Sequence, residues 1–385
     1  MALQEGVQIL KGKARTLKGI DVLKKIVICG YHGFSNSGDE ALLWAMIDVL
    51  KKKCEDIHIT VLSMHPESTA KLYGVDSVYR YDLFKIIGLF RSSDLFLFGG
   101  GSLLQDVTSS RSLMYYLTIL RLALMCKIKV MLYGNGIGPL DGKRNRLLTR
   151  KILNKVNLIT LRDDLSDKLL AEIGVNVPPI KITADPAFTL EPDNLPKSEI
   201  TLAVGDLKKT KYAVIAVREW KSAVTGFEEA VAKSLDMLFE KHGIISVFVP
   251  MQYKEDREIS KRISARMKYG TVFIDKSLEV NEIFSLIASS QICVGMRLHT
   301  LIYATTLGVP AVALSYDPKV TAFMQSINQP LCLDVKDFGE EDMTRMLDEL
   351  CGRLPEVKGM LEASLTELRD KARENAEMAI DLLNK

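Results

Sequence analysis

Short runs of apolar residues alternate along this chain with longer segments in which apolar residues recur at helical spacing. In the first half, the runs that predict buried strands are 26–29, 57–62, 95–98, 129–133, 158–161 and 181–183. The segments that predict helices between them are 40–50, 113–126, 143–155 and 165–172. This alternation is typical of a mostly parallel sheet covered by helices. The first half therefore predicts a doubly wound, Rossmann-like domain.

The alternation stops between Glu191 and Lys211, where prolines, a glycine and many charged residues are typical of a linker. It then restarts, with predicted strands at 212–217, 244–249, 272–274, 292–294 and 311–314. Beyond about Leu333 the pattern is helical and charged, with no further strand signal. We therefore expect an α/β fold of two Rossmann-like domains. The predicted segments are an N-terminal extension (1–24), a first domain (25–195), a second domain (211–335) and C-terminal helices (336–385).

Composition narrows the class of protein. A chain of 385 residues is long for one core, and a net charge of +3 is too small to indicate nucleic-acid binding. The six cysteines form no CxxC pair, which favours reduced cysteines in a cytoplasmic protein. No apolar stretch is long enough to span a membrane, and the first 25 residues do not resemble a signal peptide. No motif has the spacing of a metal site, so we expect neither a metal nor a cofactor.

Glycine-rich loops follow three predicted strands of the first domain, at 30–40, 99–106 and 134–139. Carboxyl ends of parallel strands meet at one edge of a sheet, where open α/β sheets bind ligands. These loops therefore predict one substrate-facing rim. Asp39 and Glu40 close the first loop, and they could orient substrate hydroxyls or only favour the dipole of the helix that begins there.

Segment 289–314 reads as strand, polar turn, helix and strand, and it carries Arg297 and His299 just past the first of these strands. In an extended backbone two residues at this spacing point the same way, and a helix N-terminus nearby attracts anions. Arg218 follows another strand of the same domain. Two arginines and a histidine could clamp a small dianion. The alternative is that Arg297 pairs with a carboxylate and His299 is a core residue.

A basic segment lies in the first domain, with Asp141 as the only nearby acid. Its members are Lys143, Arg144, Arg146, Arg150 and Lys151. They could form an ordinary solvated helix face, or a patch for a diphosphate or a lipid head group. In addition, Arg162 follows the strand predicted at 158–161.

Five motifs in this order resemble the polysaccharide pyruvyltransferase family. They are SGDEA (37–41), GGGSLLQD (99–106), ADPAF (184–188), IAVR (215–218) and GMRLHT (295–300). The resemblance covers roughly residues 25–330, and within the family it is strongest to CsaB-type enzymes, which modify the secondary cell-wall polymer of Gram-positive bacteria. It implies a glycosyltransferase-B-like fold, with a C-terminal helix that could cross back to the first domain.

The resemblance also implies an activity: transfer of a pyruvyl group from phosphoenolpyruvate to the terminal N-acetylmannosamine of a lipid-linked disaccharide diphosphate. The product would be a 4,6-ketal on a polymer that anchors surface-layer proteins, made at the inner face of the membrane with possible peripheral contact. The family's phosphoenolpyruvate ligands would fall on Arg218, Arg297 and His299.

Chemistry on these residues would need a dianion clamp, a proton donor and a base. Arg297 and His299, with Asp39 and Glu40, are the expected catalytic residues. The residues expected on the acceptor side are Asn36, Gly38, Gly100, Gln105, Asp106 and Arg162. Two alternatives stay open at this point: a glycosyltransferase of the same fold that uses a nucleotide-sugar donor, and a catalytically inactive sugar-binding protein.

Overall fold

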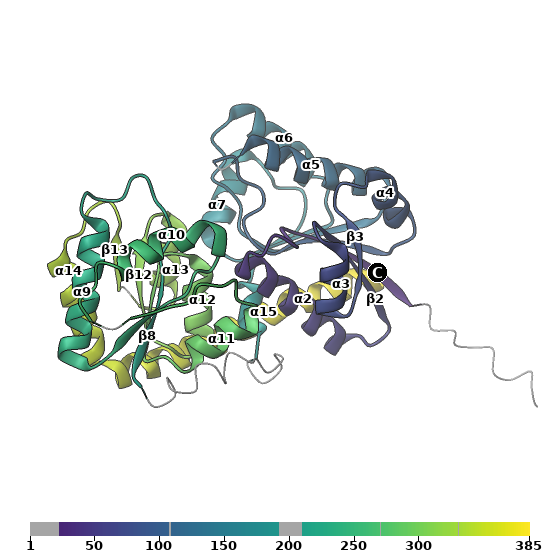
Figure 1. Ribbon diagram of the computed structural model, residues 1–385. Coiled ribbons are helices and arrows are strands. Elements are labelled where there is room, and N and C mark those ends of the chain that lie inside the picture. The colour runs from purple at the N-terminus through teal and green to yellow at the C-terminus, as the bar shows by residue number, and fades with distance from the viewer. Residues whose placement is uncertain (1–22, 108, 192–209, 270, 330) are drawn as a thin grey trace, which may run out of the picture.

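The computed structural model describes residues 23–107, 109–191, 210–269, 271–329 and 331–385. Two parallel sheets lie side by side, each covered by helices on both faces (Figure 1). Most of the predicted N-terminal extension and of the predicted linker lies outside the described residues. The two parallel-sheet α/β halves confirm the predicted pair of Rossmann-like domains.

The first sheet has seven strands within the described residues, in the order β3-β2-β1-β4-β5-β6-β7. Its strands are β1 (Lys24–Cys29), β2 (Ile57–Ser63), β3 (Asp76–Tyr79), β4 (Leu95–Gly99), β5 (Lys129–Asn135), β6 (Leu158–Leu161) and β7 (Ile180–Ile182). Its helices are α2 (Ser37–Lys53), α3 (Pro66–Tyr73), α4 (Leu83–Arg91), α5 (Ser110–Met125), α6 (Lys143–Leu153), α7 (Asp164–Ile173) and the short 3-10 helix η1 (Pro186–Thr189).

The second sheet has six strands within the described residues, in the order β10-β9-β8-β11-β12-β13. Its strands are β8 (Tyr212–Ala216), β9 (Ile245–Phe248), β10 (Thr271–Phe273), β11 (Ile292–Gly295), β12 (Ala311–Ser315) and β13 (Cys332–Asp334). The helices that follow them are α9 (Phe227–His242), α10 (Tyr253–Ser264), α11 (Val280–Ala288), α12 (Leu298–Thr306), α13 (Pro318–Ser326), α14 (Glu340–Gly352) and α15 (Leu354–Asn384).

In both sheets the chain reverses its direction of winding at a switch point, between β1 and β4 in the first and between β8 and β11 in the second. A crevice opens at such a point, beyond the carboxyl ends of the strands. The loops after β1 and β4 are glycine-rich, and the loops after β8 and β11 carry Arg218 and Arg297. The topology therefore places most of the candidate residues at the two switch points.

Local sequence explains the helix that closes the first glycine-rich loop. The side chain of Asn36 accepts a hydrogen bond from the backbone N–H of Gly38, which fixes the start of α2. Asp39 and Glu40 lie in its first turn and three lysines in its last turn, as the helix dipole favours. This cap starts the helix at Ser37, earlier than the apolar pattern predicts.

The long helix α15 joins the two halves. It begins beside α14 and runs under the first sheet, where the chain ends (Figure 1). Near its end, Ala376, Ala379 and Leu383 belong to the apolar core under β1, β2 and β4. A second core cluster contains Leu42 of α2 and Phe188 of η1 together with Leu301 of α12. Apolar packing is therefore continuous from one half to the other.

Candidate functional site

The two halves meet where α12 of the second half faces the glycine-rich loop of the first half. The hydroxyl of Tyr303 donates a hydrogen bond of 2.7 Å to the backbone oxygen of Ser37. A Cβ atom on Gly38 would lie 2.3 Å from Nδ1 of His299, so only glycine fits beneath this imidazole. The structure thus brings together two residues, Gly38 and His299, that lie 261 positions apart in the sequence.

His299 is held as a neutral imidazole. Its Nε2 atom is buried and has no hydrogen-bond partner among the described residues. Burial lowers the pKa of His299 to about 4; the charge of Asp185 opposes this shift, whereas Arg162 and Arg297 add to it. At neutral pH the imidazole is therefore uncharged, with one ring nitrogen free to accept a proton.

Asp39, the residue after Gly38, has a pKa that is shifted upward, whereas the pKa of His299 is shifted downward. Its carboxyl is buried, accepts a hydrogen bond of 2.6 Å from Nδ2 of Asn36, and would lie 2.7 Å from a Cβ atom on Gly101. Burial, together with the negative charge of Glu40, raises the pKa of Asp39 to about 8. This carboxyl therefore keeps its proton near neutral pH and can act as an acid.

Two cations from different halves converge on the hydroxyl of Ser102, the residue after Gly101. Nη2 of Arg162 donates to Ser102 Oγ over 3.0 Å, and Nζ of Lys319 donates to the same oxygen over 3.1 Å. Nη1 of Arg162 also donates to Asp185 over 2.6 Å. Burial, and the like charge of Arg162, lower the pKa of Lys319 to about 8. An anion placed between the two cations would relieve their repulsion, so this is the strongest candidate for an anion site in the cleft.

Lys319 was not predicted from the sequence. The signal was available, because Asp317, Pro318 and Lys319 directly follow β12 and open α13, the same position relative to a strand that singled out Arg297. What the sequence could not show is that the Lys319 side chain reaches across to Ser102 and to the backbone oxygen of Gly138.

Arg297 corrects one expectation. The sequence predicted an extended segment with Arg297 and His299 on the same side, but α12 begins at Leu298 and Arg297 is its N-cap residue. The helical turn directs the two side chains differently. Nε and Nη2 of Arg297 each donate over 2.7 Å to the fully buried carboxylate of Asp256, and Nη2 also contacts Glu255. The ion-pair alternative therefore describes Arg297 correctly.

Arg218 lies in a neighbouring part of the second half. Its guanidinium stacks on the ring of Tyr316, 4.9 Å from the centroid, and Nη1 donates to the Tyr316 hydroxyl over 3.0 Å. It lines a pocket of about 480 Å³ at the start of α9, together with Trp220. Nε of Arg218 and Nε1 of Trp220 are both buried with no partner among the described residues. Arg297 and His299 are not among the residues that line this pocket, but Arg218 and Arg297 follow the neighbouring ends of β8 and β11. Binding of phosphoenolpyruvate by the three residues together stays a prediction.

Glu40, Asp106 and Gly100 have structural partners. Glu40 accepts bonds from the Gly33 backbone and the Tyr73 hydroxyl, facing away from Asp39 along α2. The Asp106 carboxylate accepts from the backbone N–H groups of residues 141 and 142 and from Asn145, which fastens the start of α6. Gly100, at a φ of 74°, packs against Leu42. Gln105 precedes Asp106 in the same loop. These contacts account for the residue types without a substrate.

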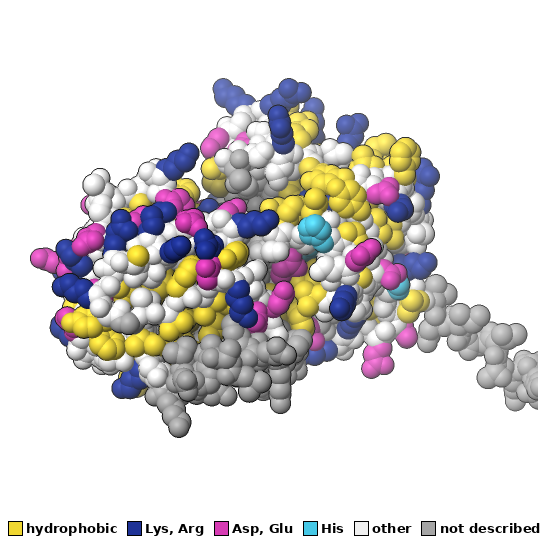
Figure 2. Space-filling view, in the orientation of Figure 1, with side chains coloured by type: hydrophobic (Ala, Val, Ile, Leu, Met, Phe, Trp, Pro, Cys, Tyr) yellow, Lys and Arg dark blue, Asp and Glu magenta, His cyan; other side chains and the backbone are white. Residues whose placement is uncertain are grey.

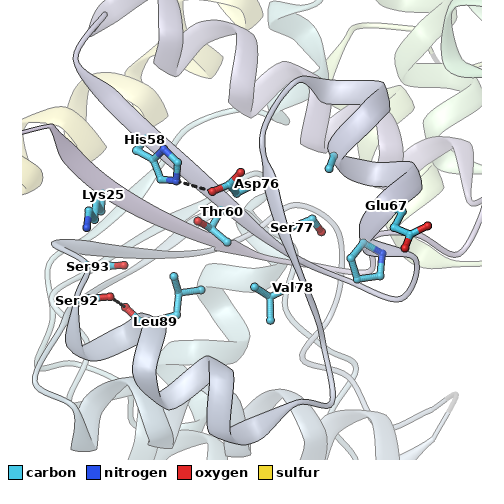
Figure 3. Close-up of a pocket in the computed structure, with 12 residues that line it drawn as sticks. Lys25, His58, Thr60, Glu67, Asp76, Ser77, Val78, Leu89, Ser92 and Ser93 are labelled. Atoms are coloured by element: carbon cyan, nitrogen blue, oxygen red, sulfur yellow. Dashed lines mark hydrogen bonds and ion pairs between the residues drawn. The ribbon is translucent and has the colours of Figure 1, made fainter.

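Two further hollows are present among the described residues: one of about 140 Å³ lies between the first glycine-rich loop and residues 277–280 of the second half, and the other lies away from the cleft. Figure 3 shows a pocket of about 440 Å³ lined by His58, Thr60 and Asp76, at the amino ends of β1, β2 and β3. The His58 ring lies 2.9 Å from the Asp76 carboxylate there. This is the opposite edge of the sheet from the glycine-rich loops. Within the described ranges, no group of three or more His, Cys, Asp or Glu side chains is placed to hold a metal ion, and metal-independence stays a prediction.

Comparison with known proteins decides the family. The model of the polysaccharide pyruvyl transferase family matches residues 36–318, which include the end of the first glycine-rich loop, Arg162 and His299. The chain belongs to this family. Like its other members, it is a pyruvyltransferase. It is also 22% identical to the amylovoran biosynthesis protein AmsJ of Erwinia amylovora, over 90% of this chain and 96% of that protein. A role in polysaccharide biosynthesis is consistent with both.

Solved structures of similar fold belong to proteins that handle nucleotide sugars. HepE of Anabaena, crystallised with UDP-glucose, has a TM-score of 0.64 and 10% sequence identity, with 94% of this pyruvyltransferase and 99% of HepE covered. A putative UDP-N-acetylglucosamine 2-epimerase from Listeria monocytogenes has a TM-score of 0.66 and 10% identity, with 93% and 95% covered. At this level of identity the likeness establishes the fold alone. In the described part of the pyruvyltransferase, no helix is long and apolar enough to cross a bilayer.

Proposed function

We propose that this pyruvyltransferase moves the pyruvyl group of phosphoenolpyruvate onto a sugar, forming a ketal and releasing phosphate. The observation that carries the proposal is the arrangement in the cleft between the two halves. A protonated carboxyl (Asp39) and a neutral imidazole (His299) flank Gly38, and two cations (Arg162 and Lys319) converge on Ser102 beside them. The reaction needs an acid, a base and a site for an anion, and the cleft contains all three.

The chemistry can be followed proton by proton. The phosphoenolpyruvate phosphate binds beside Arg162 and Lys319. Because Asp185 already pairs with Arg162, Lys319 supplies most of the charge that offsets the phosphate. Asp39 gives its proton to C3, which becomes a methyl group while positive character develops at C2. A sugar hydroxyl attacks C2 and passes its proton to Nε2 of His299. His299 passes this proton to the phosphate as the bond from C2 to the phosphate oxygen breaks and phosphate leaves. A second hydroxyl then attacks C2 and gives its proton to the Asp39 carboxylate, which closes the ketal ring and restores both groups.

Arg297 and Arg218 take supporting parts in this scheme. The charge of Arg297 is met by Asp256, so Arg297 positions the start of α12 and with it His299. Arg218 and the unpartnered donor of Trp220 lie in the adjacent pocket, where they suit the carboxylate of phosphoenolpyruvate or part of the acceptor.

For the acceptor we propose the terminal N-acetylmannosamine of a lipid-linked disaccharide diphosphate, pyruvylated as the 4,6-ketal. The product belongs to a secondary cell-wall polymer that anchors surface-layer proteins. This part of the proposal is supported by the motif resemblance to CsaB-type enzymes. It places the enzyme in the cytoplasm, at the inner face of the membrane.

The test is phosphate release from phosphoenolpyruvate in the presence of a soluble sugar diphosphate mimic. We expect the parent protein to release phosphate only with both substrates. We expect His299→Ala to lower single-turnover release by about 10²–10⁴-fold, because a general base acts in the transition state. Calorimetric binding of phosphoenolpyruvate should change less in this variant. Release of a nucleoside diphosphate from a nucleotide sugar would instead establish the glycosyltransferase alternative. We include this alternative because HepE, a protein of similar fold, was crystallised with UDP-glucose.

A further inference from the structure

Helix α4 carries apolar side chains on its exposed side as well as on its buried side, and it lies on the surface of the first half (Figure 1). Its sequence is LFKIIGLFR. Ile86 and Phe90 pack into the core, as an ordinary surface helix requires. On its other side, Leu83 is 42% exposed and Phe84 is 92% exposed. A phenylalanine left almost wholly in water indicates a surface that is covered in use.

Further exposed apolar side chains surround this helix. Tyr79 and Tyr81 end β3 and the turn after it, and Tyr81 lies 5.1 Å from the ring of Tyr115 on α5. Val107 and Met114 are exposed at the start of α5, which packs beside α4. We call these six residues the apolar face: Tyr79, Tyr81, Leu83, Phe84, Val107 and Met114. Figure 2 shows hydrophobic side chains gathered over this part of the first half, with Lys and Arg side chains around its upper edge.

The rim of the apolar face is mostly cationic. The charged residues within α4 are Lys85 and Arg91, and Arg111 is exposed one turn from Met114 on α5. The exposed Lys143 and Arg144 open α6, whose Asn145 contacts Ser110 at the start of α5 over 3.4 Å. The acids of these segments are Asp82, Asp106 and Asp141. Of these, Asp82 caps α4 and pairs with Lys85, and Asp106 is bonded to the start of α6.

We propose that the apolar face docks on an anionic lipid bilayer, with Phe84 and Leu83 inserted among the head groups and acyl chains. Apolar residues with cations around them are the composition of interfacial membrane-binding surfaces. A second copy of this chain suits the face less well, because a two-fold contact would bring its cationic rims together. This proposal rests on the proposed function, because a lipid-linked acceptor is the reason for the enzyme to contact a bilayer.

The apolar face is also connected to the cleft. The guanidinium of Arg80 lies 5.6 Å from the ring of Tyr81 and 5.0 Å from the ring of Phe34, which belongs to the glycine-rich loop. Two residues of the same loop, Gly38 and Asp39, form one wall of the site. A sugar whose lipid is anchored in the bilayer under the apolar face therefore has a short path to Asp39 and His299.

The test uses the full-length protein and sedimentation with vesicles of phosphatidylcholine alone or mixed with phosphatidylglycerol. We expect binding to the mixed vesicles, and we expect Phe84→Ser to weaken it by about tenfold or more, as loss of one buried aromatic side chain predicts. The matched control is Val177→Ser, which removes an apolar side chain of 70% exposure near the opposite edge of the sheet and should bind as the parent does. Lys85→Glu with Arg111→Glu should weaken binding to the mixed vesicles.

Turnover with a soluble acceptor mimic separates this proposal from the proposed function. Phe84→Ser should keep that turnover and its melting temperature while it loses vesicle binding. Equal vesicle binding by Phe84→Ser and the parent would overturn the docking proposal, whatever the activity. A parent dimer in sedimentation velocity that Phe84→Ser dissociates would also overturn it, because the apolar face would then bind a second copy.

Discussion

The residue type of Arg297 suggests that it binds an anionic substrate, whereas its contacts suggest that it stabilises the fold. Its bidentate partner Asp256 has no exposed surface, and the Arg297 side chain is 12% exposed. Removing one member of such a pair leaves a buried charge without a partner. We therefore expect Arg297→Ala to lower the free energy of unfolding by about 3–5 kcal/mol, measured by urea denaturation.

Arg353 provides the control, because it makes comparable ion pairs with Glu349 and Glu356 at roughly half exposure. Arg353→Ala should cost less than about 1 kcal/mol. If Arg297→Ala were as stable as the parent and had lost only phosphoenolpyruvate affinity, Arg297 would be a substrate ligand after all.

Asp39 makes stability depend on pH. Its pKa is raised from 3.8 to about 8, so the folded protein binds an extra proton across that range and loses stability as pH rises through it. His299, with its pKa lowered from 6.5 to about 4, has the opposite effect, but only below pH 6.5. Between pH 6.5 and 8 the Asp39 effect is therefore unopposed by His299.

We expect the parent to lose up to about 2 kcal/mol of stability relative to Asp39→Asn over this interval, since one pKa unit corresponds to about 1.4 kcal/mol. Asparagine has the shape of the protonated carboxyl but does not titrate. The measurement is chemical denaturation of both proteins at a series of pH values. If the free energy of unfolding changed with pH in the same way for both proteins, Asp39 would be ionised in the folded protein.

The sequence located much of the candidate site, because glycines and charged residues at strand ends are visible without coordinates. Asn36, Gly38, Asp39, Arg162 and His299 are indeed gathered in the cleft. The sequence could not show which charges already have partners. Asp256, which forms the ion pair with Arg297, lies on α10. This helix is mostly charged, so no apolar pattern in the sequence distinguishes it from a loop.

At the scale of elements, a buried amide on α15 bonds to the first half in addition to the apolar packing of that helix. Nδ2 of Asn375 donates to the backbone oxygen of Ala184 over 3.1 Å, and its Oδ1 accepts from Thr183 over 2.9 Å. Replacing Asn375 by Ala removes both bonds, which takes a buried donor from the Ala184 oxygen. The Thr183 hydroxyl, in contrast, keeps the Leu161 backbone oxygen as a partner. We expect the free energy of unfolding to fall by about 1–3 kcal/mol in guanidinium titrations.

A neighbouring residue of α15 offers the comparison for this prediction. Glu377 pairs with Lys53 at the surface, and Glu377→Ala should change stability by less than about 1 kcal/mol. Equal losses from the two substitutions would mean that Asn375 is not a specific anchor.

Elements with strong apolar runs were predictable, and elements without them were not. β4, β8 and β12 are buried along their length and β1 and β5 beyond their first residues, and their positions follow from the pattern. β3 is a short edge strand with little burial, and α10 is mostly charged. β13 lies where the sequence indicated no further strand. Each of these takes its structure from a neighbour and not from its own hydrophobicity.

At the scale of the whole molecule, the two halves share one apolar core. The cluster around Leu42, Phe188 and Leu301 contains residues of both halves, and α15 packs against the first half after leaving the second. Separate domains with a polar contact would unfold independently. We instead expect one calorimetric transition, with equal calorimetric and van't Hoff enthalpies. Two resolved transitions would show that the shared cluster contributes little to stability.

The path of α15 has a consequence for biosynthesis. The ribosome makes the first half early, but the residues that complete its core, Ala376, Ala379 and Leu383, are among the last to be joined. Until they emerge, the nascent first half exposes the apolar surface that α15 later covers, and a nonsense codon before Ala376 would leave it exposed permanently. The half that is translated first is therefore the one whose folding finishes last.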